Sequence, residues 1–261
     1  TYIVDGRPRT PRNGSRARYG EMVTLKWGLQ QSNNWISAYL MRKLNPQAFV
    51  DLLRAYGILN PEIHPSMALC LGPCDISVGE MASAYTAFVN HGIHASLMFV
   101  TKIEDSEGNV IAQFQPRMNE VISEESAHKM LYMLKAVVNG GTASRLRNKY
   151  NLKGDIAGKT GTTNNNSDAW FMGVTPTLVN ACWVGGDDRD IHFESMAMGQ
   201  GASGALPIFA LYMQKVYSDL QLGYNENAIF DMPEGYNPCA VVGEALEDDD
   251  MNDIEEIYEY D

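Results

Sequence analysis

The chain has 261 residues, of which 45% are hydrophobic and 10% aromatic, values typical of a globular protein with one sizeable core or two small ones. It contains no run of about 18 apolar residues, so the sequence predicts no transmembrane helix. The formal net charge is −12, but ten acidic residues lie within residues 244–261, and without them the net charge is −2. The acidity therefore belongs to the tail, which is predicted to be solvated and disordered, and not to the folded body.

The chain opens with a segment rich in arginine, proline and glycine over residues 1–20, which is predicted to be an irregular loop. Its basic residues are Arg7, Arg9, Arg12, Arg16 and Arg18. They are not interleaved with aromatic residues and match no nucleic-acid-binding motif, so we expect no nucleic-acid partner. We expect these arginines to flank a channel for an anionic substrate.

Residues 21–218 are predicted to form a folded domain, because their apolar residues recur at the spacings of helices and strands. Apolar residues at helical spacing predict helices over residues 22–31, 35–43, 46–56, 77–90, 124–138 and 205–217. Alternating patterns between turn residues predict a hairpin of 99–104 with 110–114, and strands over 155–162, 168–175 and 178–185. Periodicity is lost from residue 219, so residues 219–261 are predicted to be an extension that ends in the acidic tail.

A Ser-x-Asn triad, Ser32-Asn33-Asn34, lies between the first two predicted helices. A triad at such a junction can present a hydroxyl and an amide to a substrate. Serine and asparagine are also the residues preferred at helix N-termini, where the side chain accepts a hydrogen bond from the backbone. Taken alone, the triad therefore favours an ordinary helix cap.

The chain contains a single Ser-x-x-Lys spacing, at Ser126 and Lys129. It falls in the predicted helix 124–138, which Ser123 is expected to cap. The apolar stripe of that helix is formed by Met130, Leu131, Met133, Leu134 and Val137. Ser126 and Lys129 are thus predicted to lie on the polar face of a helix and to have no catalytic role.

The run Lys159-Thr160-Gly161-Thr162 is predicted to lie on a strand that ends in a polar turn. Such a run offers an ammonium group, hydroxyls on alternate residues and a glycine that lets a substrate approach the backbone. An isolated Lys-Thr-Gly triplet is also explained by chance or by a glycine turn in an ordinary edge strand, with no functional role. Here the triplet follows Ser-x-Asn by more than a hundred residues, which is the order found in the penicillin-recognising enzymes.

Further segments make this resemblance specific. They are Glu80 to Gly92 (EMASAYTAFVNHG), Gly141-Thr142-Ala143, and the two strand segments 168–176 and 183–188. Over roughly residues 13–217 the chain resembles the transpeptidase domain of class A (bifunctional) penicillin-binding proteins. The form Lys-Thr-Gly-Thr-Thr, rather than Lys-Thr-Gly-Thr-Ala, also favours class A over class B. The resemblance implies an α+β fold, with an antiparallel sheet flanked by helices and a helical lobe beside it. The first two of its five strands precede the family's catalytic serine, so this chain is expected to carry three.

The implied function is peptidoglycan cross-linking by a D,D-transpeptidase. In this reaction a serine attacks a stem peptide that ends in D-Ala-D-Ala, D-Ala leaves, and an amine of a neighbouring stem takes the acyl group. The implied ligands are stem peptides and β-lactam antibiotics, with no cofactor, and other cell-wall synthesis proteins are candidate partners. The implied location is the periplasmic side of the bacterial inner membrane, with a membrane anchor and a glycosyltransferase domain outside this chain.

The resemblance also assigns roles to individual residues. Ser32 would relay a proton to the leaving nitrogen, Asn34 would bind the substrate amide, and Lys159 would supply positive potential and order Ser32. Thr160 and Thr162 would hold the terminal carboxylate on either side of Gly161, and the Thr162 amide would form half of an oxyanion hole.

One departure from the family limits this chain. The family's nucleophile lies in a Ser-x-x-Lys motif ahead of Ser-x-Asn, and residues 1–31 contain no such spacing. The chain also begins without methionine or a signal peptide. We therefore expect a C-terminal part of a larger protein that lacks the catalytic serine, is inactive by itself, and leaves a sheet edge open to association.

Two other functions are compatible with the same motifs. A β-lactamase or D,D-carboxypeptidase of this superfamily would hydrolyse the acyl-enzyme, although no deacylating glutamate is identifiable in the sequence. A non-catalytic scaffold domain could keep the fold without the serine. A Ser-x-x-Lys motif and a glycosyltransferase domain upstream would exclude the scaffold.

No metal site is predicted. Cys70 and Cys74 are separated by three residues, with no second pair to complete a zinc site, and a disulfide between them stays open. The histidines match no ligand spacing; they are His64, His91, His94, His128 and His192. Cys182, within an apolar strand, is predicted to be a small buried hydrophobic residue.

Overall fold

The computed structural model describes residues 2–4 and 7–238 of the chain. The chain divides into two units, residues 1–231 and residues 232–261, and the helices and strands named below lie in the first. The predicted disordered tail from residue 244 lies outside the described residues. Among the described residues, no helix is both long enough and apolar enough to cross a membrane.

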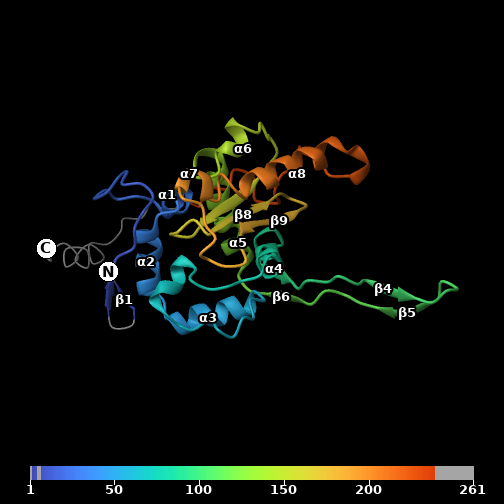
Figure 1. The fold of residues 1–261 in the computed structure, drawn as a ribbon. Helices are drawn as coiled ribbons and strands as arrows, with labels where there is room; N and C mark the ends of the chain where they lie inside the picture. The colour runs from blue at the N-terminus through green and yellow to red at the C-terminus, as the bar shows by residue number, and fades with distance from the viewer. Residues whose placement is uncertain (1, 5–6, 239–261) are drawn as a thin grey trace. The chain divides into compact units, whose positions relative to one another are not determined.

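The predicted helices are confirmed to within a few residues at their ends (Figure 1). The helices are α1 (Leu25–Gln30), α2 (Asn34–Lys43), α3 (Pro46–Ala55), α4 (Val78–Val89), α5 (Glu124–Gly140), α6 (Arg145–Asn148), α7 (Met196–Gly199) and α8 (Leu206–Ser218), with 3-10 turns η1 (Met67–Leu71) and η2 (Leu220–Leu222). The capping box expected at α4 is present, because Ser77 and Glu80 each accept a hydrogen bond from the other's backbone N–H. The sequence missed α6, α7, η1 and η2, which are too short to show a periodicity.

Within residues 2–4 and 7–238, the strands form one three-stranded sheet and three separate pairs, all antiparallel. The pairs are β1 (Tyr2–Val4) with β2 (Arg7–Arg9), β3 (Ile93–Ala95) with β6 (Met118–Glu120), and β4 (Lys102–Glu104) with β5 (Val110–Gln113); the sheet runs β7 (Ala157–Thr162), β8 (Asp168–Val174), β9 (Val179–Gly185). The three predicted sheet strands are confirmed. The irregular loop expected over residues 1–20 is wrong at β1 and β2, which are three-residue strands and too short to show alternation.

Two separate cores match the expected division into a sheet region and a helical lobe. The larger core joins β8, β9, the end of α5 and α8; Phe171 of β8 packs on Phe209 of α8 with ring centroids 5.1 Å apart. Cys182 is buried in this core, as predicted, and burial raises the pKa of its thiol to about 11. The second core joins α2, α3, η1 and α4, and the free thiols Cys70 and Cys74 pack against it.

The first unit continues beyond the expected end of the domain at residue 218. Phe230 is only 5% exposed, and its backbone N–H donates to Asp155 Oδ2 over 3.1 Å. Burial of this aromatic ring holds residues 219–231 to the sheet region. The first unit therefore extends to Asp231, and the second begins at Met232, while the expected end of the transpeptidase domain at residue 218 stays a prediction.

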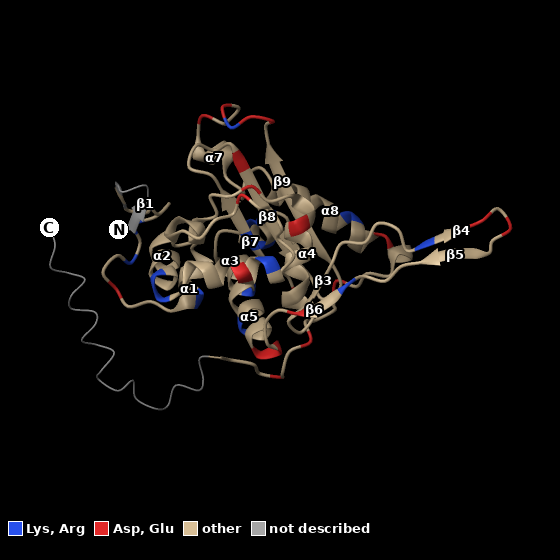
Figure 2. Cartoon of the chain, turned by 90° about the horizontal axis from the view of Figure 1, so that it is seen from below, with Lys and Arg blue, Asp and Glu red and all other residues tan. Residues whose placement is uncertain are grey.

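The hairpin of β4 and β5 extends away from the rest of the first unit (Figure 1). Its apolar side chains, among them Ile103, Val110 and Ile111, are exposed. The Asp105 carboxylate closes the turn by accepting the backbone N–H groups of Glu107 and Asn109, both at 2.9 Å. Figure 2 shows acidic residues gathered at this tip. The predicted hairpin is confirmed, and its turn is stabilised by local hydrogen bonds.

Candidate active site

Ser32 lies in the short junction between α1 and α2, where it is not used as a helix cap. Asn33 caps α2 instead, because its Oδ1 accepts the backbone N–H groups of Trp35 and Ile36 at 3.0 and 3.1 Å. Ser32 itself adopts a left-handed conformation with φ +53°, which is uncommon for a residue other than glycine. The middle residue of the triad therefore supplies the cap, and the Ser32 hydroxyl is left for another partner.

That partner is Lys159 on β7. Its Nζ donates to Ser32 Oγ over 2.8 Å and to the Thr160 carbonyl over 2.7 Å. The structure thus brings together two predicted catalytic residues that lie in different motifs. Burial lowers the pKa of Lys159 from 10.5 to about 8, because the surrounding protein solvates the ammonium poorly. A lysine with such a pKa keeps its positive charge at neutral pH and still exchanges a proton readily.

The Thr160 hydroxyl is held by a residue that the sequence reasoning did not assign to the site. Thr142 Oγ1 lies 2.7 Å from Thr160 Oγ1, and the Thr142 backbone N–H donates to the Gln30 carbonyl over 3.2 Å. Gly141 permits this approach, since a Cβ there would lie 2.3 Å from the Gln30 carbonyl oxygen. The Gly-Thr-Ala turn, which in the sequence shows only a family resemblance, thus links the end of α1 to β7.

Thr162, at the end of β7, is anchored from a third segment. Its Oγ1 accepts the backbone N–H of Gly201 over 2.9 Å. With that lone pair occupied, the Thr162 hydroxyl proton is free to point elsewhere, as a carboxylate-binding group requires. Gly161 has a structural reason to be glycine, because a Cβ would lie 3.0 Å from the Cβ of Trp170 on β8.

The second threonine of Lys-Thr-Gly-Thr-Thr shapes the turn after the strand. Thr163 Oγ1 accepts the backbone N–H groups of Ser167 and Asp168 at 3.1 and 2.9 Å. The Asp168 carboxylate in turn accepts the Trp183 indole N–H over 3.0 Å. These bonds fix the register of β7, β8 and β9 at the end of the sheet where Thr162 lies.

Asn34 forms side-chain and backbone hydrogen bonds with the segment before α1. Its side-chain Nδ2 donates to the Arg12 carbonyl over 2.6 Å, and its backbone N–H donates to Asn13 Oδ1 over 2.7 Å. Among the described residues, the recorded hydrogen bonds of Asn34 thus go to the segment before α1. The expected contact of Asn34 with a substrate amide remains a prediction.

Ser126 and Lys129 lie on the exposed face of α5, as predicted. Ser126 Oγ is 2.9 Å from Ser123 Oγ, and Ser123 caps the helix by accepting the Ser126 backbone N–H over 3.3 Å. Lys129 forms an ion pair with Glu125 at 2.7 Å. The single Ser-x-x-Lys spacing of the chain is therefore part of a helix terminus.

Comparison with known proteins agrees with this geometry. A family model described as the penicillin binding protein transpeptidase domain matches residues 6–188. Penicillin-binding protein 1A of Neisseria lactamica is 35% identical over 212 residues, which covers 78% of this chain and 26% of that protein. Penicillin-binding protein 1B of Vibrio cholerae is 34% identical over 223 residues, which covers 85% of this chain and 28% of that protein.

Solved structures show the same similarity. Penicillin-binding protein 1A from Haemophilus influenzae superposes with a TM-score of 0.74 at 26% identity, over 83% of this chain and 38% of that one. The PonA1 protein from Mycobacterium tuberculosis in complex with penicillin V superposes with a TM-score of 0.63, also at 26% identity, over 82% of this chain and 61% of that one. The chain spans about a quarter of the length of the curated relatives.

Proposed function

Because the chain belongs to the penicillin-binding protein transpeptidase domain family, we propose that it supplies the Ser-x-Asn and Lys-Thr-Gly half of a peptidoglycan D,D-transpeptidase site. The observation that carries the proposal is the 2.8 Å hydrogen bond from Lys159 Nζ to Ser32 Oγ. It joins two segments that lie far apart in the sequence, as a shared catalytic role requires. The class A resemblance is confirmed by the relatives, which are penicillin-binding proteins 1A and 1B.

In the proposed reaction, the nucleophilic serine adds to the carbonyl between the two terminal D-Ala residues. The C–N bond then breaks, and the leaving amine of D-Ala takes a proton through the Ser32 hydroxyl. The acyl group then passes to an amine of a neighbouring stem peptide, which gives up a proton as the new C–N bond forms, and the ester C–O bond breaks so that the serine oxygen regains a proton. Lys159 donates to Ser32 Oγ throughout, so it fixes the hydroxyl and favours passage of the proton toward the leaving nitrogen.

Binding of the substrate carboxylate is assigned to the end of β7. Lys159 contributes positive charge, and the hydroxyls of Thr160 and Thr162 contribute donors that Thr142 and Gly201 hold in place. The Thr162 backbone N–H would stabilise the oxyanion together with the amide of the nucleophilic serine. Removal of one oxyanion donor typically costs about 3–4 kcal/mol in the transition state.

The nucleophile must come from a segment other than residues 1–261. In this chain no Ser-x-x-Lys precedes Ser32, and Ser126 with Lys129 forms part of a helix terminus. We further propose that the complete protein acts at the periplasmic face of the inner membrane, anchored outside this chain. Its ligands would be stem peptides and β-lactams, and glycosyltransferase activity would belong to the same protein.

A fluorescent penicillin tests the proposal directly. The chain alone should form no covalent adduct that survives boiling in detergent, whereas a protein that adds a Ser-x-x-Lys segment ahead of residue 1 should be labelled on that added serine. Labelling of the chain alone at Ser32 or Ser126, mapped by mass spectrometry, would overturn the assignment. Rapid turnover of the penicillin, without a stable adduct, would favour a β-lactamase over a transpeptidase.

A further inference from the structure

A cluster of metal-binding side chains lies apart from the β7 site, where the end of α4 meets the start of α5. His91, Glu124 and His128 each offer one ligand atom, and these atoms all lie within 4.8 Å of one another. His91 Nδ1 is 2.8 Å from Glu124 Oε1, and His128 Nε2 is 3.9 Å from the same oxygen. Two imidazoles and a carboxylate are ligands that suit zinc and related transition metals.

The distances match what a bound ion would need after small side-chain movements. Zinc bonds of about 2.0–2.1 Å in a tetrahedral arrangement place neighbouring ligand atoms roughly 3.3 Å apart. The two recorded separations, 2.8 and 3.9 Å, lie on either side of that value. The remaining separation, between the two histidine nitrogens, is below 4.8 Å, and Glu124 is exposed, so its carboxylate has room to adjust to an ion.

The local structure presents all three side chains to one point. Glu124 lies in the first turn of α5 and His128 one turn later, so both project from the same face of the helix. His91 follows the end of α4 in a left-handed conformation with φ +52°. Histidine is one of the few residues other than glycine that adopt this conformation readily, and here it directs the ring toward the start of α5, where Nδ1 lies 2.8 Å from Glu124 Oε1.

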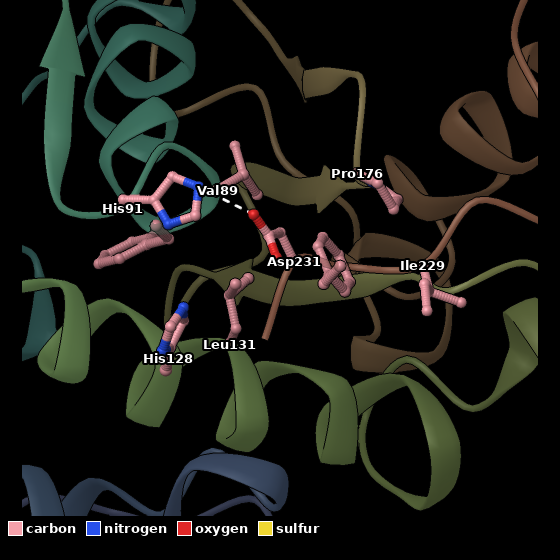
Figure 3. Close-up of a pocket in the computed structure, with 9 residues that line it drawn as sticks. Val89, His91, His128, Leu131, Pro176, Ile229 and Asp231 are labelled. Carbon is pink, nitrogen blue, oxygen red and sulfur yellow. Dashed lines mark ion pairs between the residues drawn. The ribbon is translucent and has the colours of Figure 1, made fainter. Parts of the chain in front are cut away.

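Asp231 completes the arrangement from the C-terminal end of the first unit. Its Oδ2 lies 3.5 Å from His91 Nε2, the ring nitrogen that does not face Glu124. Figure 3 shows His91 and Asp231 pointing toward each other beside His128. Histidines that bind metals commonly donate their second N–H to a carboxylate, which fixes the ring orientation.

A cavity of about 170 Å³ adjoins the cluster, with His91, His128 and Asp231 in its wall (Figure 3). Its volume leaves room for a water molecule as a further ligand. The positive N-terminal end of α5 opposes a cation here, but Glu124 and Asp231 together carry two negative charges that offset it. Another buried histidine, His94, differs because Ser83 and Asn119 occupy both of its ring nitrogens at 2.8 and 3.0 Å.

We propose that His91, Glu124 and His128 bind a zinc-like divalent metal ion, with Asp231 orienting His91. The ion would join the end of α4, the start of α5 and the segment that ends the first unit, and so stabilise the domain at a distance from the chemistry on β7. Sequence spacing did not reveal this site because His91 is separated from Glu124 and His128 of α5 by a segment of more than thirty residues that contains β3, β4, β5 and β6.

The test is zinc binding by the full chain after treatment with a chelator, measured by competition with a chromophoric chelator and by thermal unfolding. We expect one zinc ion per chain and a rise in Tm of roughly 5–10 °C at a zinc concentration about a hundred times the Kd. Glu124→Gln, His128→Gln and His91→Asn should each weaken binding more than about a hundredfold. Asp231→Asn, which acts through His91, should weaken it about tenfold.

Matched variants separate this site from other zinc ligands. Glu125→Gln removes an adjacent carboxylate that pairs with Lys129, and it should leave zinc affinity unchanged. The double variant Cys70→Ser with Cys74→Ser should also bind zinc normally. His128 is buried, so the exposed Glu124→Gln is the decisive variant if His128→Gln misfolds. Equal zinc affinity in wild type and Glu124→Gln, loss of binding in the cysteine variant, or no binding at millimolar zinc would each overturn the proposal.

Discussion

Two serine–lysine pairs in this chain have opposite characters. Ser126 and Lys129 have the spacing of a catalytic motif, but they lie exposed on α5, with Ser126 next to the helix cap and Lys129 paired with Glu125. Ser32 and Lys159 lie in separate motifs far apart in the sequence, yet they meet in a 2.8 Å hydrogen bond where burial lowers the Lys159 pKa to about 8. A local spacing describes neighbours along a helix, whereas catalytic chemistry depends on the environment that tertiary structure creates.

The largest expected difference between the pairs is in acylation. In a protein that carries this chain together with a Ser-x-x-Lys segment, Lys159→Ala and Ser32→Ala should each slow acylation by a β-lactam at least about a hundredfold. The reason is that each removes one member of a positioned proton-transfer pair. Stopped-flow measurement of the acylation rate constant is the appropriate assay.

The exposed pair supplies the control for that experiment. Ser126→Ala and Lys129→Ala should leave the acylation rate within about twofold of wild type, since both side chains are exposed on α5, Ser126 beside Ser123 and Lys129 paired with Glu125. A large loss in Ser126→Ala with little loss in Ser32→Ala would reverse the assignment of the two pairs. Far-ultraviolet circular dichroism of all four variants would show that they are folded.

Much of the fold could be predicted from sequence because its elements are long and periodic. The apolar stripe of α5 and the alternation in β7, β8 and β9 gave their positions to within a few residues. Short elements carry too few residues for a period, which is why β1, β2, α6 and α7 were missed. The antiparallel sheet and the helical lobe followed from family resemblance and are confirmed by similarity to solved structures.

The family resemblance anticipated that Lys159 orders Ser32, and the 2.8 Å hydrogen bond agrees with this expectation, but the contacts that support the pair were not predictable. The motifs identified Ser32 and Lys159, but only the structure shows that Asn33 is the helix cap and that Thr142 holds Thr160. The cap could not be assigned from sequence because all three residues of the triad are good capping residues. Thr142 could not be assigned because its partner lies on a different element.

The pH dependence of stability gives a second way to compare the buried Lys159 with the exposed Lys129. The pKa of Lys159 is about 8 when folded and 10.5 ordinarily, so between those values the unfolded chain binds more protons than the folded one. Stability therefore rises with pH through this window, by about 2 kcal/mol once partial solvent access is considered. The difference in unfolding free energy between wild type and Lys159→Met, measured in urea at pH 7.5 and pH 10.5, isolates this effect.

Other groups that titrate in the same window cancel in that difference because both proteins contain them. Lys129→Met is the matched control, since its ammonium lies on the exposed face of α5 beside Glu125. The difference in unfolding free energy between wild type and Lys129→Met should not rise between the two pH values. An equal change with pH in the two wild-type-minus-variant differences would mean that burial does not perturb the pKa of Lys159.

The close contact at Gly141, next to Thr142, predicts that Gly141→Ala lowers the unfolding free energy by about 1–3 kcal/mol. In Gly141→Ala the new methyl group would lie 2.3 Å from the Gln30 carbonyl oxygen and 2.9 Å from the Val137 Cα, both backbone atoms. Urea unfolding should show the loss, and acylation should fall with it because the turn positions Thr160. In Gly140→Ala the nearest atom is the Gln30 side-chain Nε2 at 3.1 Å, which can move, so this neighbouring variant should be close to neutral.

The smallest expected effect concerns the start of α5 and tests whether its Ser-x-x-Lys spacing is purely structural. Ser123 Oγ accepts the Ser126 backbone N–H, so Ser123→Ala should lower the unfolding free energy by about 1 kcal/mol, as loss of a helix cap usually does. Ser126→Ala removes only an exposed hydroxyl that contacts Ser123, so it should cost no more than about 0.5 kcal/mol. If the two serines had exchanged these roles, Ser126→Ala would be the more destabilising variant. Because the cap and the acylation chemistry are independent, Ser123→Ala should lower stability while leaving the acylation rate unchanged. Ser32→Ala should do the reverse, with a large loss in the acylation rate and little loss in stability.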